Sequence, residues 1–133
     1  MLKSIIADSG ASVHITDQKI INAKLIKPIK ICTASSEIFF VAQYSGDLVL
    51  KTNHNNHSYT LKNVLYVPNC GGTYISLSTL DKMGLSYQAK NGTLNIKYNS
   101  QTVLKAILDT SSGLYNLDGE IDREHHGLCH QMN

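Results

Sequence analysis

The sequence has no tryptophan, two prolines and three cysteines among its 133 residues. Cys32, Cys70 and Cys129 are odd in number and widely spaced, which argues against a disulfide framework and indicates reduced thiols in an intracellular protein. Long hydrophobic runs are also lacking: none approaches the ~18–20 apolar residues that span a bilayer, so we expect no membrane partner. The segment ahead of Asp8 is too short for a secretory signal with its cleavage site.

A strong charge of one sign is also absent. The net charge is +2 at pH 7 and the lysines are scattered, so we expect no direct nucleic-acid binding. Hydrophobic residues make up 42% and charged residues 17% of the chain, a balance typical of a globular protein. We expect one domain at residues 1–118, large enough to bury a core without a metal or disulfide. Residues 119–133 form a polar, His-rich tail.

β-Branched and aromatic residues dominate, in short runs separated by Gly, Asn and Ser. This pattern predicts an all-β fold with one short helix. The predicted strands are Ser4–Ala7, Ile29–Thr33, Ile38–Gln43, Asp47–Thr52, Ser58–Val64, Leu85–Ala89, Thr93–Tyr98, Gln101–Leu108 and Leu114–Leu117. Asn91-Gly92 predicts a two-residue hairpin, and Asn99-Ser100 a weaker one. Apolar residues at helical spacing predict a helix over 77–83, with Ser76 as N-cap and Gly84 at its end.

The sharpest local feature is Asp8, which follows the apolar run Ile5-Ile6-Ala7 and enters a Ser9-Gly10 turn. Gly10 permits a close backbone approach that a Cβ would block. Two such carboxyl groups brought close together share one proton, because ionising both would place two negative charges side by side. One can then act as general base on a water and the other as general acid toward a peptide carbonyl. The alternative for the tripeptide alone is a strand-end Asp that caps a turn.

Four blocks, in order, resemble the protease of copia-type retrotransposons. They are Asp8-Ser9-Gly10-Ala11-Ser12-Val13-His14, Val64-Leu65-Tyr66-Val67-Pro68-Asn69, Tyr74-Ile75-Ser76-Leu77-Ser78-Thr79-Leu80 followed by Gly84, and Gly113-Leu114-Tyr115-Asn116-Leu117. The resemblance implies a retropepsin-like fold and a homodimer in which each subunit gives one catalytic Asp. It implies an aspartic endopeptidase without metal or cofactor, whose substrate is its own polyprotein, in the cytoplasm within virus-like particles.

The resemblance also assigns site residues. Asp8 is catalytic, and Ser9 and Gly10 complete its turn. The residues expected near substrate are Ala11, the tip of a flap at Ala34, Ser35, Ser36 and Glu37, and Tyr74 with Ile75 beside the active-site turn. The flap tip lacks the family's Gly, and only seven residues precede Asp8, whereas retropepsins usually have a strand there. Both departures favour the alternative function, a catalytically inactive or domesticated binding module.

Other acidic and histidine residues have simpler interpretations. Asp109-Thr110-Ser111-Ser112-Gly113 could supply a second catalytic Asp in one chain, but Gly does not follow Thr110 directly, so we expect a polar turn. We expect His14 to make a structural hydrogen bond, and His54 and His57 to lie at a solvated hairpin tip. The tail residues His125 and His130 resemble the start of a zinc module, but Cys129 stands in place of its Gly and no second Cys pair follows.

Overall fold

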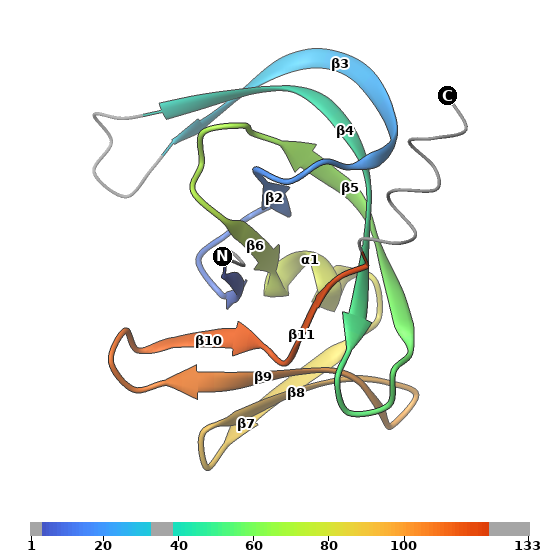
Figure 1. Ribbon diagram of the computed structural model, residues 1–133, viewed down its shortest axis with the longest axis vertical. Helices are drawn as coiled ribbons and strands as arrows, with labels where there is room; N and C mark the ends of the chain where they lie inside the picture. The colour runs from blue at the N-terminus through green and yellow to red at the C-terminus, as the bar shows by residue number, and fades with distance from the viewer. Residues whose placement is uncertain (1–3, 33–38, 123–133) are drawn as a thin grey trace.

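The computed structural model describes residues 4–32 and 39–122. The expected flap tip (34–37) and residues 123–133 of the predicted His-rich tail lie outside these ranges. Figure 1 shows strands with a single short helix, which confirms the predicted all-β fold with one helix. The elements are β1 (Ile5–Asp8), β2 (Ile15–Thr16), β3 (Ile21–Cys32), β4 (Phe39–Thr52), β5 (Ser58–Tyr66), β6 (Thr73–Ser76), α1 (Leu77–Lys82), β7 (Ser86–Lys90), β8 (Thr93–Tyr98), β9 (Gln101–Asp109), β10 (Leu114–Leu117) and β11 (Gly119–Ile121).

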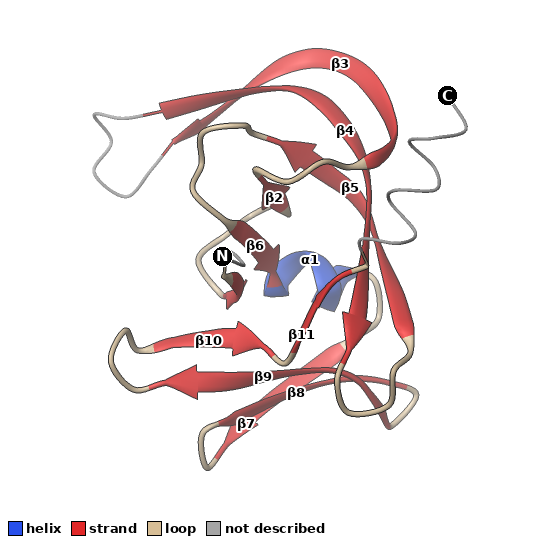
Figure 2. Ribbon diagram, viewed as in Figure 1, coloured by secondary structure: helices blue, strands red, loops and turns tan. Residues whose placement is uncertain are grey.

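The strands form one sheet in the order β11-β4-β5-β2-β6-β1-β10-β9-β8-β7, and β3 pairs with β4. Most neighbouring strands are antiparallel, but β1 pairs with β6 and β2 with β5 in parallel. In Figure 1, the long β3–β4 pair arches over one end of the molecule and the β7–β10 meander forms the other end. Figure 2 shows α1 between these two ends. β1 therefore lies in the middle of the sheet, paired on both sides.

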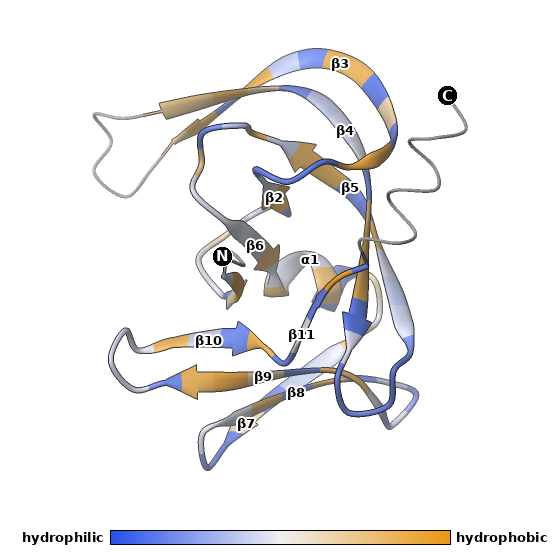
Figure 3. Ribbon diagram, in the orientation of Figure 1, coloured by the Kyte–Doolittle hydropathy of each residue, from blue (hydrophilic) through white to orange (hydrophobic). Residues whose placement is uncertain are grey.

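Two apolar clusters hold these parts together. The larger cluster joins β4 and β5 to β6, α1 and the meander, and its fully buried members include Leu48, Leu61, Ile75, Leu80 and Leu104. The smaller cluster lies under the β3–β4 pair and consists of Ala42, Leu65 and Val67, with Ile31, Phe40 and Cys70 packed against it. Figure 3 shows polar residues in the turns that join β4 to β5 and β8 to β9. The smaller cluster fastens the β3–β4 pair to the rest of the sheet.

The structure differs from the predicted strands mainly around β3 and β4. The predicted strands 38–43 and 47–52 are one strand, because Gly46 does not break it. A Cβ on Gly46 would lie 2.5 Å from the carbonyl oxygen of Ile21, so the glycine permits β3 to approach β4. The predicted strand 29–33 is the end of the longer β3. The short strands β2, β6 and β11 were not predicted, and β11 pairs with β4 just beyond Asp118.

The predicted turns and helix are confirmed. Ser76 caps α1 by accepting a hydrogen bond from the backbone N–H of Thr79, and Gly84 after the helix has φ +93°. Asn91 and Gly92, between β7 and β8, both have positive φ, as a tight two-residue hairpin turn requires. Asn99 and Ser100, between β8 and β9, do the same. The strands of this meander match their predicted bounds within one residue.

Candidate functional site

Asp8 ends β1, the central strand of the sheet. It pairs with Ser76 of β6 on one side, and Ala7 before it pairs with Tyr115 of β10 on the other. The side chains of Ile5, Ile6 and Ala7 are buried, whereas Asp8 is partly exposed. Pairing of Asp8 with β6 and of Ala7 with β10 therefore holds the backbone here, while the Asp8 carboxyl group reaches the surface of a cavity.

The turn after Asp8 orients its carboxyl group. The backbone N–H of Gly10 donates a hydrogen bond to Oδ1 of Asp8 at 2.7 Å. A Cβ on Gly10 would lie 3.3 Å from the same oxygen, closer than an ordinary van der Waals contact. A side chain at position 10 would therefore crowd the Asp8 carboxyl group, whereas the sequence had predicted a close approach of the backbone. The turn also gives the carboxyl group a defined direction in a single chain.

A cavity of about 670 Å³ opens beside this turn, a size within the range of ligand-binding pockets. Among the described residues, it is lined by Asp8, Gly10, Ala11, Ser12, Val13, Ile15, Ile31, Cys32, Phe40, Cys70 and Tyr74. One wall is the loop after β1, and the others are the ends of β3 and β4 and the loop between β5 and β6. Asp8 is the one carboxylate among these lining residues, and most of its neighbours are apolar.

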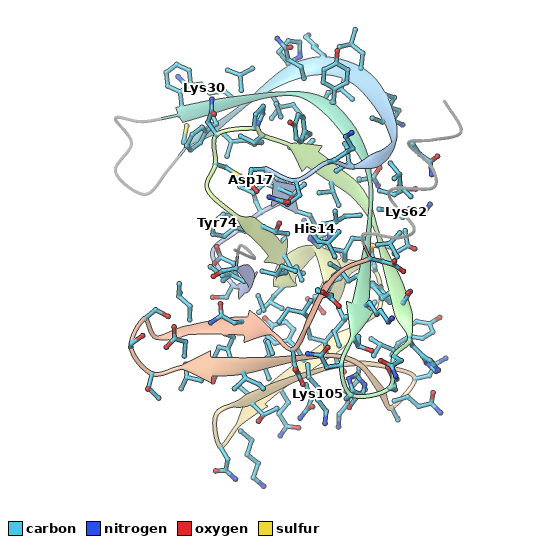
Figure 4. All side chains as sticks on the ribbon, viewed as in Figure 1. His14, Asp17, Lys30, Lys62, Tyr74 and Lys105 are labelled. Atoms are coloured by element: carbon cyan, nitrogen blue, oxygen red, sulfur yellow. The ribbon has the colours of Figure 1, made fainter. Side chains whose placement is uncertain are left out.

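The structure brings some of the expected substrate residues together and not others. Ala11 and Tyr74 line the cavity with Asp8 and Gly10. Ile75 lies in the main core and is fully buried, and Ser9 is exposed to solvent; neither lines the cavity. In Figure 4, Tyr74 lies beside β6 away from α1, and His14 lies on the α1 side. The expected flap tip falls outside the described residues.

Asp109 lies two strands away from Asp8, because β10 separates β9 from β1. A strand spacing of roughly 4.8 Å puts β9 about 10 Å from β1, too far for two carboxyl groups to share a proton. Hydrogen bonds from the hydroxyl and N–H of Ser111 and from the Ser112 hydroxyl hold the pKa of Asp109 below its ordinary value. Residues 110–113 form the polar turn that the sequence predicted.

His14 is buried, with 1% of its surface exposed. Its Nδ1 accepts a hydrogen bond from the backbone N–H of Ser76 at 2.9 Å, which confirms the expected structural role. Burial lowers the pKa of His14 from 6.5 to about 4, so the ring is neutral at pH 7. Because Nδ1 accepts, the ring proton lies on Nε2, which has no hydrogen-bond partner among the described residues.

The remaining histidines and acids form no metal site in the described part of the chain. His54 and His57 are exposed in the turn between β4 and β5, as predicted. No group of three or more His, Cys, Asp or Glu side chains converges within residues 4–32 and 39–122. In the same ranges, no helix is both long and apolar enough to cross a bilayer. His125, Cys129 and His130 lie outside the described residues.

Most residues of the cavity walls were not predicted. Ile31, Cys32 and Phe40 come from β3 and β4, whereas Cys70 comes from the loop before β6. Each is an ordinary apolar or small residue in its local sequence, and only the pairing of distant strands brings it to Asp8. No local signal in the sequence could have identified them.

The comparison with known families matches the part of the chain that carries this site. The family model described as "Pol polyprotein, beta-barrel domain" matches residues 5–85, more than half of the chain. These residues include Asp8, His14, Ser76 and every residue that lines the cavity. No solved structure matches.

Proposed function

The chain belongs to the family of Pol polyprotein beta-barrel domains, and from this premise we propose that it is the aspartic endopeptidase of a copia-type retrotransposon polyprotein. Its fold is retropepsin-like, and it works as a homodimer that cleaves its own polyprotein in cytoplasmic virus-like particles. The observation that carries the proposal is the position of Asp8. It ends a buried strand, its carboxyl group is oriented by Gly10, and it is the one acid lining a largely apolar cavity among the described residues.

In the proposed mechanism, the Asp8 carboxyl groups of two copies share one proton. The ionised carboxylate removes a proton from a water, and the water oxygen attacks the peptide carbonyl carbon. The protonated carboxyl group donates its proton to the carbonyl oxygen, which gives a neutral tetrahedral intermediate. The intermediate then collapses: the carboxylate that gave up its proton takes a proton from a hydroxyl group, the other carboxyl group donates the proton it took from the water to the amide nitrogen, and the C–N bond breaks. No covalent bond to the protein forms.

The proposal of a second copy is supported by Asp8 being the one carboxylate among the described residues that line the cavity. Asp109, the candidate for a second acid in one chain, is separated from Asp8 by β10 and is exposed and bonded to Ser111 and Ser112. A two-fold axis close to Asp8 would bring the same residue of a second copy into place. Apolar side chains exposed at this end of the molecule include Val13 and Leu114. Leu114 directly precedes Tyr115, the strand partner of Ala7, so both residues lie near Asp8 and can contact the second copy.

The cavity suits an extended peptide. Its walls carry aliphatic and aromatic side chains from Ile15, Ile31, Phe40 and Tyr74, which can bury apolar side chains on both sides of a scissile bond. The ends of β3 and β4 form a wall of the cavity, and the segment that joins them, which lies outside the described residues, would carry the flap over substrate. This arrangement supports a peptide substrate better than a small polar one.

The test is peptide cleavage by matched Asn variants. Asp8→Asn removes one ionisable group per chain without changing the size of the side chain, and we expect no detectable cleavage of a polyprotein fragment that spans the domain boundaries. Asp109→Asn makes the same change two strands away, and we expect wild-type cleavage. Cleavage that persists in Asp8→Asn, with circular dichroism unchanged, would rule out the proposed catalytic role. A folded wild-type chain that cleaves nothing at any concentration would favour the binding module instead.

A further inference from the structure

The loop that leaves Asp8 is tied to β6 and α1 by a buried set of hydrogen bonds centred on Ser76. The Ser76 side chain is fully buried, and Ser76 is the strand partner of Asp8. Its hydroxyl donates to the carbonyl oxygen of Ala11 at 2.7 Å and accepts from the backbone N–H of Thr79 at 3.1 Å. The Thr79 hydroxyl also lies 3.2 Å from the carbonyl oxygen of Ser12. A single side chain thus caps the helix and holds the catalytic turn.

His14 holds the other end of the same loop. Its Nδ1 accepts the backbone N–H of Ser76 at 2.9 Å, and its carbonyl oxygen accepts the backbone N–H of Leu65 at 2.9 Å. An N–H at the start of α1 has no partner within the helix, so His14 satisfies a buried donor that would otherwise be costly. The loop from Asp8 to His14 is therefore fastened to β6, α1 and β5 within one chain.

These contacts lead to an inference that rests on the proposed function. We propose that Ser76 and His14 are positioning residues for catalysis: they hold the Asp8–Ser12 turn in its working geometry before a second copy or a substrate binds. The carboxyl group of the second copy must meet that of Asp8 closely enough to share a proton, and a misplacement of about 1 Å can cost about 100-fold in rate. Positioning is most effective when buried supporting residues, not the mobile reactants, fix the geometry.

The first experiment compares two Ser→Ala variants of the full chain. Ser76→Ala removes the hydroxyl that holds Ala11. Ser78→Ala is the matched control, because the Ser78 hydroxyl makes a longer contact of 3.4 Å to the same carbonyl oxygen and lies 3.2 Å from the Ser76 hydroxyl, which keeps its own 2.7 Å bond to Ala11 in this variant. We measure the amide exchange of Gly10 by NMR, and kcat and KM for a peptide that the wild type cleaves. In Ser76→Ala we expect exchange about 10-fold faster and kcat about 10- to 100-fold lower, with KM within about twofold; Ser78→Ala should resemble the wild type.

A second pair separates the hydrogen bond of His14 from its packing. His14→Asn places Oδ1 where Nδ1 lies and keeps an acceptor for the Ser76 N–H, whereas His14→Leu removes the acceptor. We expect His14→Asn to keep Gly10 exchange within about threefold of the wild type, and His14→Leu to speed it about 10-fold. If His14→Leu does not fold, the comparison of Ser76→Ala with Ser78→Ala still tests the inference.

Two results would overturn the inference. One is Gly10 exchange and kcat within about twofold of the wild type in Ser76→Ala. The other is equal effects of Ser76→Ala and Ser78→Ala, which would indicate a general loosening of the helix start. The proposed function fails separately, if the wild type cleaves nothing. Gly10 exchange then still decides whether Ser76 and His14 hold the turn.

Discussion

Acid should destabilise this protein through protonation of His14. The imidazole is buried, and burial lowers its pKa from 6.5 to about 4. In the unfolded chain His14 binds a proton near pH 6.5, but in the folded protein it does so only near pH 4. The unfolded state therefore takes up a proton between these values, and the free energy of unfolding falls as the pH is lowered from 6.5 to 4.

The size of the effect follows from the two pKa values. At 1.36 kcal/mol per pH unit, lowering the pH to 5 should remove about 2 kcal/mol, and lowering it to 4 about 3 kcal/mol. Above pH 6.5 His14 is neutral in both states and adds no pH dependence. Such a loss is a large fraction of the roughly 5–15 kcal/mol that stabilises a typical domain. Protonation of His14 also breaks a contact near Asp8, because a protonated Nδ1 can no longer accept the hydrogen bond from the backbone N–H of Ser76.

Urea unfolding at pH 7, 6 and 5 measures the effect, with His14→Asn as the control. The variant keeps an acceptor for the Ser76 N–H but cannot titrate, so its free energy of unfolding should change by less than about 0.5 kcal/mol over this range. The wild type should lose about 2 kcal/mol. A wild type with constant stability from pH 7 to 5, or a variant with the same slope as the wild type, would refute the reasoning.

Three further predictions concern the fold, the catalytic mechanism and the assembly. Gly46→Ala should destabilise the protein by about 1–3 kcal/mol in urea unfolding, because its Cβ would lie 2.5 Å from the Ile21 carbonyl oxygen. Gly72→Ala is the control and should be nearly neutral, because its Cβ would meet its nearest atom at 3.4 Å. Equal destabilisation by the two variants would contradict the role of Gly46. Cleavage should be blocked by a statine-type transition-state mimic and unaffected by chelators, and loss of activity with a chelator would indicate a metal mechanism. Specific activity should rise with protein concentration alongside dimer formation in sedimentation, and full activity in a strict monomer would exclude a shared site.

Local signals in the sequence predicted the elements that depend on a few adjacent residues. The hairpin at Asn91-Gly92 was predicted because both residue types tolerate positive φ, which both adopt. The helix start was predicted from Ser76, whose hydroxyl does cap α1. The meander strands β8 and β10 were predicted with their observed bounds. The Asp8 turn was equally local, since Gly10 and the apolar run before Asp8 are adjacent in sequence.

Features that depend on distant partners could not be predicted. Most of β3 is exposed and has no alternating pattern, so its length reflects pairing with β4. Gly46 suggested a break but instead permits that pairing. The two-residue strand β2 exists because β5 and β6 flank it. The partner of His14 lies 62 residues away, and the walls of the cavity are assembled in the same non-local way.

Mixing wild-type and Asp8→Asn chains tests the central claim most directly, that two Asp8 carboxylates form one active site. A fixed amount of wild type, at a concentration where it is dimeric, receives increasing amounts of the variant, and the rate of peptide cleavage is measured. If mixed dimers with one carboxylate are inactive, random pairing should lower the rate to about half at equal amounts and further with excess variant. A rate that stays constant at all ratios would contradict the shared site.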